Sequence, residues 1–134
     1  MTLLIQIVLG AVAACGALAL LSGRNESKRL KIIALAIPVL PLIYVVFALV
    51  GVSNGTAGYG WLGYEVIGLL LFGGLGLAAF RFGAVTAAVA WAVHAIWDAT
   101  GHFDAAFVPA FYPGLCIGFD VVVAGYALYS YRES

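Results

Sequence analysis

Residues 24–50 read RNESKRLKIIALAIPVLPLIYVVFALV, a basic segment that leads into an apolar run at positions 31–50. A helix crosses the hydrocarbon core of a bilayer with about 20 predominantly apolar residues. The run therefore predicts a membrane-spanning helix. Pro38 and Pro41 predict a kink in the half that follows the basic segment, because proline removes a backbone donor and its ring clashes with the preceding turn.

The rest of the chain repeats this apolar character in four further segments, at residues 3–21, 61–80, 83–100 and 113–131. We therefore expect an all-α fold: one transmembrane helix bundle over residues 1–134, with five spans. Hydrophobic residues make up 65% of the chain and charged residues 9%, which is far from the balance of a water-soluble domain. A neutral net charge without a long basic run also argues against nucleic-acid binding.

The connecting segments are residues 22–30, 51–60, 81–82 and 101–112. In a chain with five spans, the first and third connections and the C-terminus lie on the same side of the membrane, and every basic side chain lies in or beside these parts. The positive-inside rule makes that side cytoplasmic, so we expect the N-terminus outside and the C-terminus inside. The first span is interpreted as a retained helix, because residues 1–6 lack the basic start of a signal peptide. The basic residues are Arg24, Lys28, Arg29, Lys31, Arg81 and Arg132.

Small residues at helical spacing predict close helix contacts. Gly114 and Gly118 are one turn apart in the last span, and such spacing lets two helix backbones approach each other in lipid. Cys15 and Cys116 are isolated within apolar segments, without the Cys-x-x-Cys spacing of a redox or zinc motif. We expect both cysteines to be small buried hydrophobic residues.

Five ionisable side chains lie within or at the ends of the apolar segments: Glu65, His94, Asp98, His102 and Asp120. Such groups are costly at membrane depth and usually face a bundle interior, where they serve a function. At a rise of about 1.5 Å per residue, all five lie within about 10 Å of the outer membrane boundary. Spans that are distant in sequence thus bring their polar residues to one layer, which predicts a shared site.

His94, Asp98 and His102 follow one another at intervals of four residues, which places neighbours on one helix face. His94 and Asp98 are therefore positioned to bind one metal ion or to share one proton. His94 and His102 would be about 12 Å apart along a straight helix, so either the helix unwinds at Gly101 or His102 serves a second site. Asp120 has apolar sequence neighbours, and His94 is its natural partner from another helix.

Imidazole and carboxylate ligands suit a divalent transition metal such as Zn, Fe or Mn. We assign His94, Asp98 and His102 as candidate metal ligands, and Glu65 and Asp120 as candidate acid–base groups or further ligands. Each residue also has a simpler interpretation. The histidines would form interhelical hydrogen bonds, Asp98 would accept from a nearby N–H, and Glu65 would contact interfacial water.

The segment at residues 103–112, FDAAFVPAFY, is too apolar for a solvated loop. We expect it to lie in the membrane interface as a short helix over the polar site. There it would exclude water and admit a lipid-like ligand from the side. The simpler alternative is a hydrophobic linker that is anchored by its aromatic side chains.

The last two spans carry a resemblance to a family of small, functionally uncharacterised bacterial integral membrane proteins with the pattern H-A-x-W-D, Y-P, C and D. The resemblance implies that these residues belong together and that the chain resides in a bacterial inner membrane, and it implies no activity. Gly101-His102 stands where the family pattern has two adjacent histidines, so a two-metal site is not implied. The matching residues are His94-Ala95-Ile96-Trp97-Asp98, His102, Phe111-Tyr112-Pro113, Cys116 and Asp120.

Three functions are compatible with these residues. The first is a metal-dependent membrane enzyme that acts on a lipid-like or isoprenoid substrate. The second is a structural or accessory subunit, alone as a homo-oligomer or within a membrane complex, whose polar cluster joins helices. The third is a proton- or ion-coupled carrier, although the cytoplasmic half offers no comparable residues to complete a pathway.

Overall fold

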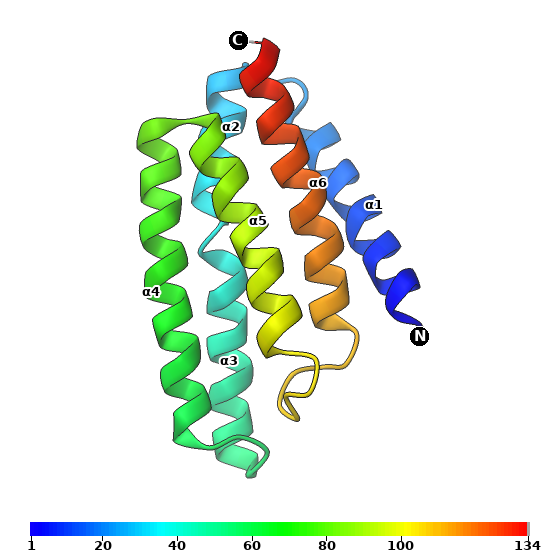
Figure 1. Cartoon of the computed structure of the whole chain (residues 1–134), viewed down its shortest axis with the longest axis vertical. Helices are drawn as coiled ribbons and strands as arrows, with labels where there is room; N and C mark the ends of the chain where they lie inside the picture. Colours follow the sequence, from blue (N-terminus) through cyan, green and yellow to red (C-terminus); the bar gives the residue numbers. More distant parts are fainter. Residues whose placement is uncertain (134) are drawn as a thin grey trace.

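The computed structural model describes residues 1–133, and these residues contain helices and no β-strand. The helices α2 and α3 are the two halves of one kinked helix, so the chain forms five rods (Figure 1). The bounds are α1 Leu3–Leu21, α2 Glu26–Ala36, α3 Val39–Asn54, α4 Tyr59–Phe82, α5 Ala84–Gly101 and α6 Tyr112–Glu133.

The break between α2 and α3 confirms the predicted kink. Pro38 precedes α3, and the Ile37 amide bonds to the Ala34 carbonyl, three residues back instead of four. The Ile33 carbonyl, which a regular helix would pair with that amide, instead accepts the indole N–H of Trp91 at 3.2 Å. The kink is therefore stabilised by a contact from α5.

Local chemistry places the helix ends differently from the expected spans. α2 begins at Glu26 and not at residue 31, because the Asn25 side chain caps it by accepting from the Lys28 amide at 2.9 Å. α3 continues past residue 50 and ends at Asn54, where Gly55 follows with a φ of 79° that glycine readily adopts. Gly83, with φ of 89°, forms the turn between α4 and α5.

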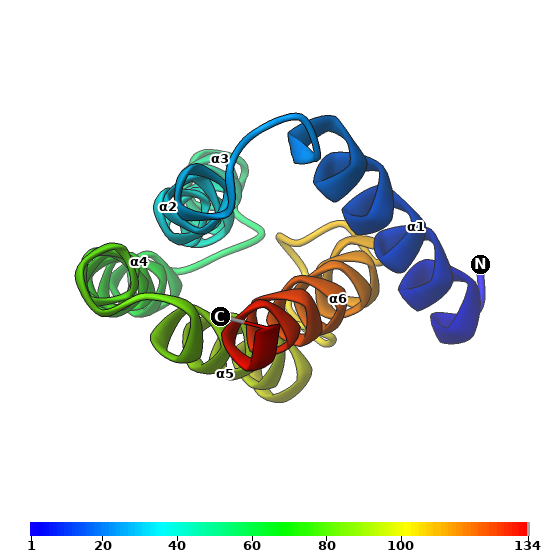
Figure 2. The ribbon, with the colours of Figure 1, turned by 90° about the horizontal axis from the view of Figure 1, so that it is seen from above.

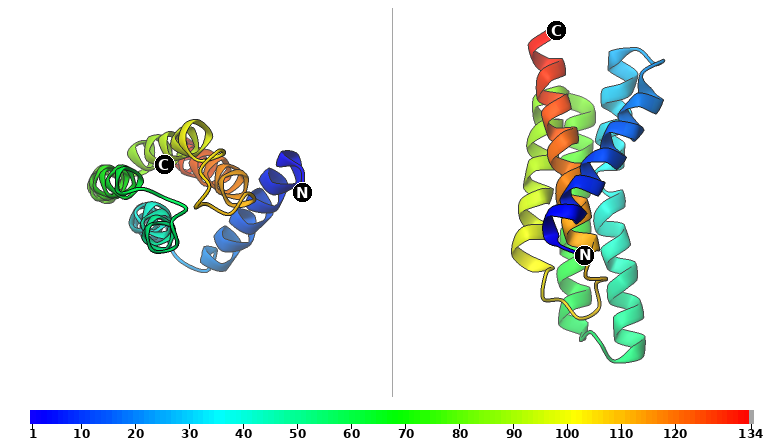
Figure 3. Two further views of the ribbon diagram at one scale, coloured as in Figure 1. Left: turned by 90° about the horizontal axis from the view of Figure 1, so that it is seen from below. Right: turned by 90° about the vertical axis from the view of Figure 1, so that its right-hand side faces the viewer.

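The rods are arranged as a bundle in which α3 lies beside α4, α4 beside α5 and α5 beside α6 (Figure 2). α1 packs against α6 and crosses it obliquely at the edge of the bundle (Figure 3). The start of α2, the α4–α5 turn and the end of α6 lie together at one end (Figure 1). All six Lys and Arg residues lie in these segments or in the connection that leads into α2, and we call this the basic end.

The crossing of α1 and α6 depends on glycine, as the spacing of Gly114 and Gly118 predicted. A Cβ atom added to Gly118 would overlap the carbonyl of Ile7, and one added to Gly10 would overlap the carbonyl of Leu115. The two backbones are therefore in direct contact. This packing holds α6 between α1 and α5.

Four helices are long and apolar enough to cross a membrane: α1, the kinked α2–α3 helix, α4 and α6. Their mean hydropathies in the best window are 2.4, 2.8, 1.7 and 1.3. The expected fifth span, α5, is not among them. Its 18 residues include His94, Asp98 and two tryptophans, which lower its hydropathy, and it packs between α4 and α6 (Figure 2).

The outer surface of the rods is rich in exposed apolar side chains, such as Leu4, Leu20 and Leu77. Such a surface suits lipid and would be unfavourable in water. Cys116 is buried as expected, but the expectation for Cys15 is wrong because this residue is exposed. Cys15 lies on the face of α1 that points away from α6, next to the buried Ala14.

The segment between α5 and α6 is a series of turns and not the expected short helix. Its amides at Ala105, Val108 and Tyr112 each bond to the carbonyl three residues back. Three of its side chains are buried, because Ala105, Phe107 and Val108 form one cluster with Tyr44 and Ala48 of α3. The expected position over the polar site stays a prediction. Phe107 also packs on Gly51, where a Cβ would lie 2.6 Å from the Phe107 Cβ atom. Burial against α3 therefore holds this segment in an irregular conformation.

Candidate functional site

Three helices bring the five ionisable side chains together in the bundle interior, toward the end opposite the basic end. α4 contributes Glu65, α5 contributes His94 and Asp98 and ends at His102, and α6 contributes Asp120. None of these residues is more than 1% exposed. The convergence that the sequence predicted is therefore present in the fold.

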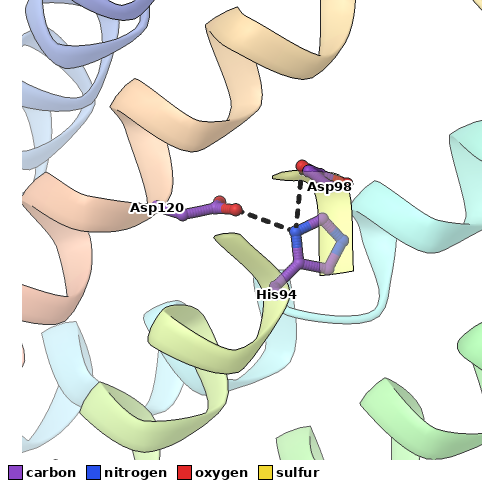
Figure 4. Close-up of side chains that lie close together, drawn as sticks. All are labelled: His94, Asp98 and Asp120. Atoms are coloured by element: carbon purple, nitrogen blue, oxygen red, sulfur yellow. Dashed lines mark hydrogen bonds and ion pairs between the residues drawn. The ribbon is translucent and has the colours of Figure 1, made fainter. Parts of the chain in front are cut away.

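His94, Asp98 and Asp120 form a first group (Figure 4). The His94 Nδ1 atom is 2.8 Å from the Asp120 Oδ2 atom and 3.5 Å from the Asp98 Oδ2 atom. The predicted contact between Asp120 and the helix of His94 is thus confirmed. One imidazole nitrogen faces two carboxylates from two different helices.

His102 and Glu65 form a second group beside the first. The His102 Nε2 atom is 2.8 Å from the Glu65 Oε1 atom, and the His102 Nδ1 atom is 3.7 Å from the Asp98 Oδ1 atom. Asp98 therefore lies between the two imidazoles. Of the two alternatives for His102, the structure shows the second: α5 remains helical to Gly101, and His102 contacts a separate carboxylate.

Several polar atoms of the site lack a hydrogen-bond partner among the described residues. They include both oxygens of Asp98, the Asp120 Oδ1 atom, the Glu65 Oε2 atom and the His94 Nε2 atom. The Tyr44 hydroxyl lies near Asp98, but outside hydrogen-bond geometry. Leaving a buried polar atom unpaired typically costs about 1–3 kcal/mol, and more when the group is charged. The described residues therefore leave part of the hydrogen-bonding capacity of these polar atoms unused.

Aromatic rings enclose the two groups. The Tyr44 ring stacks on the His102 imidazole with centroids 4.0 Å apart, and the Phe72 ring meets the His94 imidazole edge-on at 4.7 Å. Tyr44 was not foreseen as a site residue. Its sequence signal is its depth, because it lies well inside an apolar span and not at the membrane boundary where tyrosine is usual.

The site is closed in this conformation. The five side chains are at most 1% exposed, and they do not line the cavities described for residues 1–133. The nearest along the chain is a groove of about 530 Å³ lined by Gly60, Trp61, Tyr64, Thr100 and Gly101. It adjoins Glu65 and His102 in sequence, and the Tyr64 ring, stacked on Trp97 at 4.4 Å, is part of its wall.

The first group has the donor set of a metal site, and one of its two distances matches the spacing of metal ligands. Ligand atoms that each lie 2.0–2.2 Å from one tetrahedral ion are roughly 3.3–3.6 Å apart. The His94 and Asp98 atoms meet this spacing at 3.5 Å, and Asp120 is closer at 2.8 Å. One imidazole and two carboxylates with free oxygens therefore fit a divalent transition metal.

This grouping differs from the assignment made on sequence. His102, assigned as a ligand, pairs with Glu65 outside that group, whereas Asp120, assigned as an acid–base group or a further ligand, lies among the potential ligands. The roles of all five residues stay predictions. Comparison with protein-family models, with characterised protein sequences and with solved structures finds no match to this chain.

Proposed function

We propose that this chain is a bacterial inner-membrane protein that binds one divalent transition metal ion, such as Zn, Fe or Mn, through His94, Asp98 and Asp120. The ion lies in the outer half of the bilayer. It would act as a Lewis acid for chemistry on a lipid-like or isoprenoid substrate. Glu65 and His102 would hold or move protons beside it.

The charge balance of the buried groups carries this proposal. Three carboxyl groups face two imidazoles, and none of these residues is more than 1% exposed. Even two protonated imidazoles would leave one negative charge, and no Lys or Arg forms an ion pair with these carboxylates in the described residues. A buried uncompensated charge is strongly unfavourable. A divalent cation held by His94, Asp98 and Asp120 would supply the missing positive charge. A proton on one carboxyl group would remove the same imbalance without a metal, and elemental analysis separates the two cases.

Elemental analysis of the purified protein tests the metal. We expect about one Zn, Fe or Mn atom per chain, and a tenfold or greater loss of metal affinity in Asp120→Asn and His94→Gln, because each removes a ligand. Asp104→Asn is the matched control, since Asp104 is an exposed carboxylate in the segment between α5 and α6. Metal-free wild-type protein, or equal losses in the control, would contradict the proposal.

The orientation has its own test. We propose five spans, with α5 as the fifth, the N-terminus outside and the basic end in the cytoplasm. Ser53 and Ser27 are both exposed, near opposite ends of the bundle. In a variant without native cysteines, a cysteine at Ser53 should react with a membrane-impermeant reagent in intact cells, and one at Ser27 should not. The reverse pattern would place the metal site in the cytoplasmic half.

A structural role is the second candidate, and the closed site favours it. The five side chains are at most 1% exposed, so a substrate would reach them only if part of the surrounding structure moved. The polar contacts also join α4, α5 and α6, as expected of a cluster that ties a subunit together. A carrier is less well supported, because the core toward the basic end is formed by residues such as Ala34, Ala79 and Ala127.

A further inference from the structure

A second polar feature lies at the basic end, away from the His and carboxylate groups. A cavity of about 450 Å³ opens between the start of α2 and the end of α4. Two cationic side chains, Lys31 and Arg81, line it together with the Ser27 hydroxyl. Glu26 is the one acidic residue in the lining, so the cavity has a net positive charge.

The two cations are available to a ligand. The Lys31 Nζ atom lies 5.4 Å from the Phe80 ring centroid, and the Arg81 guanidinium carbon lies 6.0 Å from that of Phe82. These contacts hold the cations at the cavity while leaving their hydrogen-bond donors free. No carboxylate within residues 1–133 lies at ion-pair distance from either side chain.

An apolar surface continues from the cavity along the bundle. α2 and α4 are in close contact there, since a Cβ on Gly76 would lie 2.9 Å from the Ala34 carbonyl oxygen. The side chains that flank this contact are exposed: Leu35 by 54% and Leu77 by 68%. The cationic cavity suits the charged headgroup of an amphiphile at the membrane boundary. The exposed apolar surface along the α2–α4 contact suits its apolar chain.

We propose that this cavity binds the headgroup of an anionic phospholipid from the leaflet at the basic end. The phosphate would accept hydrogen bonds from Lys31, Arg81 and Ser27, and an acyl chain would lie along Leu35 and Leu77. Basic pockets between transmembrane helices recognise anionic headgroups in this way, and charge-assisted bonds to phosphate are strong. The site goes beyond the proposed metal function and does not depend on it.

Native mass spectrometry of the full chain in detergent, titrated with phosphatidylglycerol or phosphatidylcholine, tests the proposal. We expect wild-type protein to retain phosphatidylglycerol preferentially. The double variant Lys31→Gln, Arg81→Gln should lose about thirtyfold in affinity, given the usual contribution of a basic residue near a membrane surface. The charge-retaining pair Lys31→Arg, Arg81→Lys should still bind, which separates loss of the site from loss of the fold.

The matched control is the double variant Arg24→Gln, Lys28→Gln. It removes the same charge from the same end, and all four side chains are exposed, but neither Arg24 nor Lys28 lines the cavity. We expect less than a threefold effect. Equal losses in the two double variants would show diffuse attraction and overturn the site, as would wild-type protein without a preference for phosphatidylglycerol. Displacement of the lipid by millimolar inorganic phosphate would also overturn the lipid site, because it would identify the ligand as a free anion. Metal content should be unchanged throughout.

Discussion

Replacement of His94 by alanine is expected to lower the free energy of unfolding in detergent by about 3–5 kcal/mol, because it leaves the Asp120 carboxylate buried without its partner. Asp120→Asn should cost about 1–3 kcal/mol, since the 2.8 Å contact loses its charge. The double variant should cost less than the two single losses added together. Removing the second residue of a coupled pair strands no further charge. Chemical unfolding of all four proteins measures this.

Metal content of the same four proteins separates the competing functions. A metal centre predicts that each single variant loses metal while its helix content is retained. A structural cluster predicts that the variants are less stable than the wild type. It also predicts that none of the four proteins contains metal. Losses of stability that simply add would show that His94 and Asp120 act independently, and we would then abandon the metal site in favour of a structural subunit.

The contact between Asp120 and His94 could be predicted from two quantities alone. These are the depth of the carboxylate within an apolar helix and the free-energy cost of burying it without a partner. A carboxylate two turns into an apolar helix requires a partner. His94 is the ionisable residue that lies deepest in the preceding helix. The kink at Pro38 and the close approach at Gly118 are predictable for a similar reason, since each follows from covalent geometry at one position.

The pairing of His102 with Glu65 could not be predicted in the same way. The sequence places both residues near one end of the bundle, but the rotation of α4 about its own axis decides whether Glu65 faces His102 or lipid. That rotation depends on contacts such as Trp97 on Gly68, where a Cβ would lie 3.0 Å from the indole ring. Individual side-chain contacts of this kind produce no periodic pattern in the sequence from which the rotation of α4 could be predicted.

The turns between α5 and α6 illustrate a further limit. Their apolar composition correctly predicts that the segment is not a solvated loop, but it does not distinguish a helix from buried turns. Phe107 packs on Gly51 of α3, a contact between residues that are distant along the chain. Tyr44 was missed for the same reason, since its ring becomes part of the site only once α3 faces α5.

Gly118→Ala is expected to destabilise the protein by about 1–3 kcal/mol or more, because the added Cβ would overlap the Ile7 carbonyl and force α1 away from α6. Gly125→Ala, in the same helix, is the matched control. Nothing lies within 4 Å of its Cβ, so the same substitution should leave stability unchanged or raise it by about 0.5–1 kcal/mol through lower backbone entropy in the unfolded chain. Unfolding in detergent measures both variants.

The two substitutions should also differ in metal binding. Gly118 faces α1, and Asp120, two residues later, faces His94 on α5. A displacement of α6 that relieves the overlap at Ile7 would therefore move the Asp120 carboxylate relative to His94, and metal sites tolerate only about 0.5 Å of such movement. We expect weaker metal binding in Gly118→Ala and wild-type binding in Gly125→Ala. Unaltered stability and metal content in Gly118→Ala would show that the α1–α6 contact does not position Asp120.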